Sequence, residues 1–70
     1  MQISNIQYYI DDMSKHEYSA FMKHEYNVSI YFNMKSDADD ELTIVGRDND
    51  VKNAMNVMFN NDAEQIALYM

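Results

Sequence analysis

The spacing of apolar residues first predicts helical structure near the start of the chain. Ser4 and Gln7 have the spacing of a helix-capping box. The apolar residues that follow recur as on one helical face: Ile6, Tyr9, Ile10 and Met13. Ser14 and Glu17 repeat the capping pattern, and a second, shorter stripe comes after them: Tyr18, Phe21 and Met22. Because the two stripes do not share a register, we expect two short helices, or one helix broken near Ser14.

From Asn27 onward the apolar period changes to two, which is typical of a strand with one buried face. The inward set is Val28, Ile30, Phe32 and Met34. A polar loop over residues 36–41 then leads to residues 42–45, the expected partner strand of a hairpin. Asp48 or Asn49 is the expected cap of a following helix. The apolar stripe of that helix is Val51, Ala54, Met55, Met58 and Phe59.

The last seven residues fit two interpretations. Asp62 and Gln65 would cap a helix over residues 64–70, whereas Ile66, Leu68 and Met70 alternate as in a third strand. We favour the strand, because residues 60–62 form a strong helix breaker. In both cases the predicted fold class is α+β. It comprises short N-terminal helices, an antiparallel β-hairpin, a further helix and a possible third strand, with the helices on one face of a small sheet.

The length of the chain predicts a single small domain over residues 1–70. Its composition predicts a homodimer. A chain of 70 residues gains only marginal stability from one core, and the absence of cysteine removes disulfides and zinc-thiolate sites. Oligomerisation is then the natural source of further stability for a chain that is 47% hydrophobic. No apolar run is long enough to span a membrane, and no signal peptide precedes the domain, so we expect a cytoplasmic protein.

Candidate catalytic and metal-binding patterns are weak. Lys15-His16-Glu17-Tyr18 recurs as Lys23-His24-Glu25-Tyr26, but the two histidines are eight residues apart instead of the four of a zinc protease motif. Residues 37–48 lack the glycine and the final glutamate of a calcium loop. No nucleophile motif or phosphate-binding loop is present. We therefore expect no enzyme activity, no cofactor and no metal.

Methionine and tyrosine are unusually frequent, with seven and six residues respectively. Most of the methionines fall on predicted apolar faces and are interpreted as core filling: Met13, Met22, Met34, Met55 and Met58. Tyr8, Tyr31 and Tyr69 fall on or near the opposite faces. They are interpreted either as dimer contacts or as ordinary surface.

Acidic residues give the best indication of function. The chain has 12 acidic and 5 basic residues, for a net charge of −7, which argues against direct binding to nucleic acid or to an anionic membrane. Six of the carboxylates lie within residues 37–50, where Arg47 is the only basic residue. The intervening strand would hold Glu41 and Asp48 roughly 23 Å apart. Together with Asp11 and Asp12 near the predicted end of the first helix, these carboxylates form the predicted partner-binding set: Asp11, Asp12, Asp37, Asp39, Asp40, Glu41, Asp48 and Asp50.

Size, acidity, the lack of cysteine and the acidic grouping over residues 37–50 resemble those of small phage-encoded DNA-mimic proteins. One type inhibits the bacterial nucleoid protein HU, and another occupies the channel of the sliding clamp. The resemblance implies a dimeric competitive inhibitor in the host cytoplasm, whose carboxylates replace phosphates on a basic, HU-like DNA-binding protein. Two alternatives remain open: a regulatory adaptor that binds through an apolar surface, and an antitoxin-like neutraliser of a basic toxin.

Overall fold

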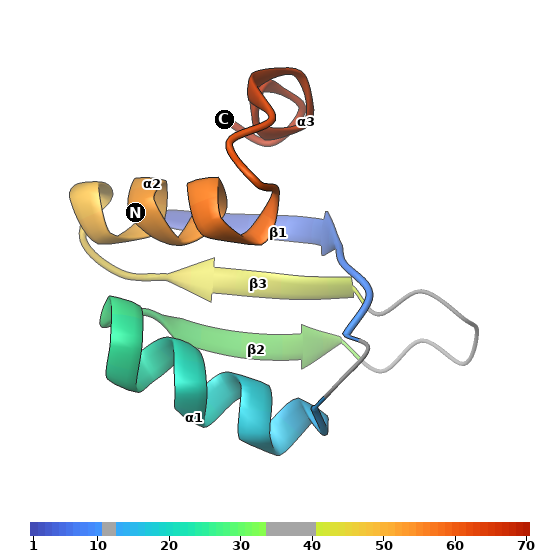
Figure 1. The fold of residues 1–70 in the computed structure, drawn as a ribbon, viewed down its shortest axis with the longest axis vertical. Helices are drawn as coiled ribbons and strands as arrows, with labels where there is room; N and C mark the ends of the chain where they lie inside the picture. The colour runs from blue at the N-terminus through green and yellow to red at the C-terminus, as the bar shows by residue number, and fades with distance from the viewer. Residues whose placement is uncertain (11–12, 34–40) are drawn as a thin grey trace.

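The computed structural model describes residues 1–10, 13–33 and 41–70, and it confirms the α+β class. In these residues the chain forms three strands and three helices (Figure 1). Their order is β1 (Gln2–Gln7), α1 (Lys15–Tyr26), β2 (Ser29–Asn33), β3 (Glu41–Val45), α2 (Asp48–Met58) and α3 (Ala63–Ala67).

The strands form one antiparallel sheet in the order β1-β3-β2, with β3 in the centre. The pairing of β2 with β3 runs from Ser29 opposite Val45 to Asn33 opposite Glu41, which confirms the predicted hairpin. The residues that connect these two strands, including Met34 and most of the predicted polar loop, lie outside the described part of the chain. The third strand of the sheet comes from the N-terminus and not from the C-terminus.

The N-terminal helix predicted from Ser4 is wrong, because residues 2–7 form β1. A bulge lies between Ile3 and Ile6, where Asn5 has a left-handed backbone with φ of 61°. The extra residue brings both isoleucines to the buried side at a spacing of three, which imitates one turn of a helix. After the bulge the alternation is that of an extended chain, since Ile6, Tyr8 and Ile10 pack inward while Tyr9 is 66% exposed.

The predicted helix after Ser14 is confirmed as α1. The Ser14 hydroxyl oxygen accepts a hydrogen bond from the backbone N–H of Glu17 at 3.2 Å. The helix ends at Asn27, which is left-handed with φ of 57° and donates its N–H to the Lys23 carbonyl. Tyr18 and Met22 of the predicted stripe are buried, whereas Phe21 remains exposed.

Helix α2 carries the predicted apolar stripe, but its N-cap lies one residue before Asp48 and two before Asn49, the two expected caps. Arg47 is the N-cap, and its side chain makes no capping hydrogen bond. Its carbonyl accepts the first helical bond from Val51 at 2.8 Å. Asp48 and Asn49, the two predicted caps, therefore lie inside the first turn. All the stripe residues are buried or half-buried: Val51, Ala54, Met55, Met58 and Phe59.

The C-terminal residues form the short helix α3, so the favoured third strand is wrong there. Asn60 and Asn61 are both left-handed and end α2, as the breaker prediction required. The Asp62 side chain then accepts hydrogen bonds from the N–H groups of Glu64 and Gln65. Burial does not follow the alternation that suggested a strand, because Leu68 is 78% exposed while Ile66 packs against the core.

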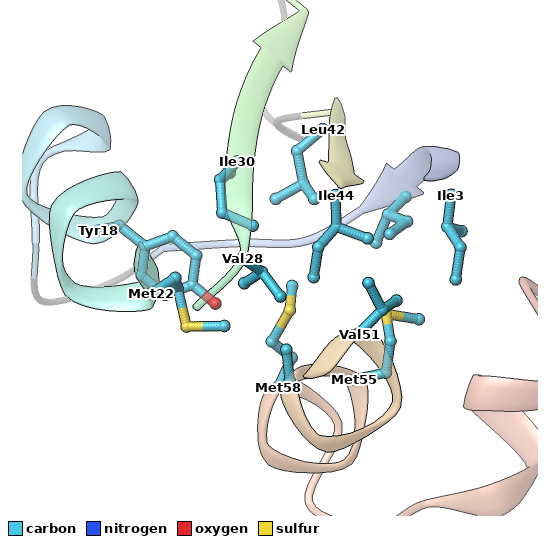
Figure 2. Packing of buried hydrophobic residues seen from close by; sticks show 12 residues of the cluster. Ile3, Tyr18, Met22, Val28, Ile30, Leu42, Ile44, Val51, Met55 and Met58 are labelled. Carbon is cyan, nitrogen blue, oxygen red and sulfur yellow. The ribbon is translucent and has the colours of Figure 1, made fainter. Parts of the chain in front are cut away.

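Helices α1 and α2 cover one side of the sheet, which we call the covered face. Figure 2 shows side chains of the strands and of both helices meeting in one apolar cluster on this side. Its members are Ile3, Ile6, Tyr18, Met22, Val28, Ile30, Leu42, Ile44, Val51, Ala54, Met55 and Met58. The prediction of helices on one face of a small sheet is thus confirmed.

The residues that alternate with the buried strand positions form the other side of the sheet, which we call the open face. Strand register places them in three rows across the sheet. The rows are Gln2–Val45–Ser29, Thr43–Tyr31 and Gln7–Glu41–Asn33. None of these eight residues belongs to the apolar cluster.

Candidate functional site

Two of the predicted partner-binding carboxylates lie together in the first turn of α2. Asp48 is 71% exposed, and its carboxylate is 3.6 Å from the ammonium group of Met1. Asp50 is half-buried and accepts a hydrogen bond from the Asn27 side chain at 3.4 Å. Free N–H groups at a helix N-terminus favour anions, so both carboxylates already have local stabilisation. Their presence therefore has a structural reason.

Glu41 lies at the other end of β3 and is not brought close to this pair. It begins the strand on the open face, opposite Asn33 and Gln7, whereas Asp48 follows the end of the strand (Figure 1). The strand separates two acidic positions, as the sequence predicted. The other members of the set, Asp11, Asp12, Asp37, Asp39 and Asp40, lie outside the described residues.

Further carboxylates lie on exposed helix positions. Glu17 and Glu25 project from α1 and Glu64 from α3, in each case at an exposed residue. Among the basic residues described, Lys15 lies over the Phe32 ring at 5.8 Å, and the others are exposed: Lys23, Arg47 and Lys52. Negative charge is therefore spread over several elements and is not confined to the one segment that the sequence emphasised.

The open face is the second candidate surface, and its composition differs from that of the acidic positions. Tyr31 is 59% exposed at its centre, next to the half-buried Thr43. Glu41 is two residue pairs further along the sheet, diagonal to Tyr31 on the same face. Alternation in the sequence had placed Tyr31 and Ser29 on the outward side, but it gave no indication of Thr43 as the cross-strand neighbour of Tyr31. That pairing depends on the register of β3.

Tyr8 and Tyr69 are not on outward surfaces, which corrects the interpretation as dimer contacts or ordinary surface. Tyr8 stacks on Tyr18 with ring centroids 5.7 Å apart and meets the edge of Phe59 at 5.8 Å. Tyr69 stacks on Phe59 at 5.8 Å, and its hydroxyl oxygen accepts a hydrogen bond from the Gln7 backbone. These contacts attach α3 to β1 and α2. Sequence reasoning missed the cluster because it assigned the first and last segments to the wrong elements.

Burial of the side chain gives the phenol of Tyr18 a raised pKa. Loss of solvent around its hydroxyl raises the pKa of Tyr18, and the neighbouring Tyr8 and Tyr26 raise it further. A phenol that holds its proton this strongly has no use as a base near neutral pH. The Tyr18 side chain is instead a core residue with a hydroxyl group.

Metal-ligating side chains do not converge in the part of the chain that the structure describes. His16 and His24 are both exposed on α1, and no group of three potential ligands is found within these residues. A shallow cleft of roughly 350 Å³ lies elsewhere, between β1, α2 and the C-terminal residues. It is lined by Met1, Ile3, Lys52, Tyr69 and Met70, so its lining is largely apolar.

Comparisons with known proteins give no further identification. No protein-family model matches the chain, and no significant match is found among curated proteins or solved structures. Within the described residues, no helix has the length and apolarity needed to cross a membrane.

Proposed function

We propose that this protein binds a basic, nucleic-acid-binding protein and competes with nucleic acid for its surface, as a DNA mimic does. The observation that carries the proposal is the net charge of −7 on a domain with maximum dimensions of 30 × 26 × 20 Å. A field of this strength accelerates encounter with a positively charged groove and repels nucleic acid itself.

Two structural features support this proposal. Glu41 and Asp48 lie at opposite ends of β3, and exposed glutamates on α1 and α3 extend the negative surface beyond that strand. A partner whose lysines and arginines normally contact phosphates would pair with Glu41 and Asp48 instead, while the glutamates on α1 and α3 add only to the long-range field. We further propose that the protein acts in the cytoplasm and as a homodimer, since a second copy would double the charge presented to the partner.

The first test is a pull-down from bacterial lysate at low salt, followed by stepwise elution with NaCl. A DNA-binding protein that is released both by salt and by competing duplex DNA supports mimicry, because ionic contacts with phosphate-binding groups weaken steeply with salt. A charge-matched acidic peptide controls for non-specific retention. A partner that resists salt and ignores DNA would instead support the apolar adaptor.

A charge-matched pair of variants makes the test specific to the predicted contacts. The double variant Asp39→Lys/Asp40→Lys should abolish binding, whereas Glu17→Lys/Glu25→Lys on α1 should retain most of it at the same net charge. If both variants lose binding equally, only overall charge matters and the contact set is wrong. An antitoxin-like neutraliser would behave in the same way with salt, but its partner would not be released by duplex DNA.

A further inference from the structure

The open face carries an exposed aromatic ring and a carboxylate, and none of its eight described residues is basic. Tyr31 projects from β2 at 59% exposure, and its direct partner across the sheet is Thr43. Glu41 is the diagonal neighbour on the same side. Such diagonal neighbours in an antiparallel pair are about 7–8 Å apart, within reach of long side chains.

We propose that an arginine side chain of the basic partner docks on the open face, with its guanidinium over the Tyr31 ring and its N–H groups directed to Glu41. This inference rests on the proposed function and names the contact that such a partner makes. A cation is attracted to the face of an aromatic ring, and a planar guanidinium can stack there while its edge still donates hydrogen bonds.

Charge and side-chain chemistry favour an arginine on the open face over a nucleic-acid base, an apolar segment or a lysine. Nucleic-acid bases also stack on exposed tyrosines, but Glu41 and a net charge of −7 would repel their phosphates. An apolar helix or strand face would find little to contact, because six of the eight open-face residues are polar or charged and Val45 is only partly exposed. Lysine lacks the flat π system of arginine, so the geometry favours arginine.

The remaining open-face residues suit the rim of such a contact. Ser29 and Gln2 lie beside Val45, and Asn33 and Gln7 lie beside Glu41. These neutral polar groups can donate to or accept from a partner without adding a charge that opposes it. The covered face, in contrast, packs against α1 and α2, so among the described strand residues those of the open face are the ones outside the apolar cluster.

The test uses two probes, a short poly-arginine peptide and a poly-lysine peptide of equal length, titrated into the ¹⁵N-labelled chain. We expect the amide signals of Ser29, Tyr31 and Thr43 to shift with poly-arginine, and poly-arginine to bind about two- to fivefold more tightly than poly-lysine. Tyr31→Leu should remove that preference, and Tyr31→Phe should keep it. Tyr9→Leu is the matched control, since Tyr9 is slightly more exposed than Tyr31, at 66%, and lies outside the sheet.

The outcomes separate this inference from the proposed function. Equal affinity for the two peptides, or shifts that spare the open face, would overturn the arginine site while leaving the electrostatic function intact. No binding of either peptide at low salt would overturn both. Shifts of the same amides on simple dilution of the free protein would show that a second copy occupies the face, and the arginine site would then be wrong.

Discussion

The covered and open faces of the sheet are built from alternating residues of the same strands, yet they have different roles. In β3, Leu42 and Ile44 are fully buried, while Thr43 between them is only half-buried. The covered face meets two helices and contributes to the one apolar cluster of the described residues. Among the described residues, none of the eight open-face residues belongs to that cluster. A strand only five residues long therefore contributes to the core on one side and leaves the residues of the other side outside the apolar cluster.

The two faces should differ most in the loss of unfolding free energy when neighbouring side chains of β3 are truncated. Ile44→Ala should lower the free energy of unfolding by about 2–5 kcal/mol, because it removes buried methyl groups and leaves a cavity. Thr43→Ala in the adjacent position should cost about 1 kcal/mol or less. Urea unfolding followed by circular dichroism measures both. Equal losses would contradict the assignment of the two faces.

The bulge at Asn5 decides which residues of β1 reach the covered face. Asn5→Val should destabilise the fold by about 1–3 kcal/mol, because a β-branched residue is strained at a φ of 61°. Asn5→Gly is the control and should stay within about 0.5 kcal/mol of the original chain, since glycine adopts this conformation freely. Thermal unfolding of the two variants measures the difference. If valine were tolerated as well as glycine, the bulge would not fix the register.

The pH dependence of the free energy of unfolding tests the burial of Tyr18 on the covered face. Its pKa is raised in the folded state, so the folded chain holds this proton more strongly than the unfolded chain, whose phenol titrates near about 10. The contribution of Tyr18 is constant below that pH, and stability falls above it by up to about 1.4 kcal/mol per pH unit. Tyr18→Phe should be nearly as stable at pH 7 and should lose this alkaline decline. Unfolding curves at pH 7, 9 and about 11 compare the two. If the stability of Tyr18→Phe declines with rising pH as much as that of the original chain, groups other than Tyr18 cause the alkaline loss.

Residues 14–33 and 41–62 were predictable because local signals agree with the packing there. Ser14 caps α1, period-two alternation identifies β2, and the apolar stripe of α2 faces the core as expected. The two ends were misassigned for specific physical reasons. At the N-terminus, Ile6, Tyr9, Ile10 and Met13 have the spacing of a helical face, but residues 2–7 form β1, and Tyr9 and Met13 are exposed. At the C-terminus, the Asp62 cap outweighed the alternation of Ile66 and Leu68.

The candidate site was less predictable than the fold, because a site depends on contacts between distant segments. The sequence showed that Glu41 and Asp48 are separated by a strand. It did not show that Asp48 faces the Met1 ammonium or that Asp50 is bonded to Asn27. Likewise, Tyr31 was placed on an outward side, but its position diagonal to Glu41 follows only from the register of β2 against β3.

The smallest stability effect is expected on the open face, where Tyr31 and its neighbour Phe32 form a matched pair within β2. Phe32 is half-buried against the core and lies under Lys15, so Phe32→Ala should cost about 2 kcal/mol or more. Tyr31→Ala should cost only about 0.5 kcal/mol, the value of a modest cross-strand contact with Thr43. Both values come from urea unfolding at the same pH and salt. A loss for Tyr31→Ala as large as that for Phe32→Ala would mean that the ring is packed and not available to a partner. A small loss would leave the exposed ring without a role in stability, which is what a residue kept for recognition requires.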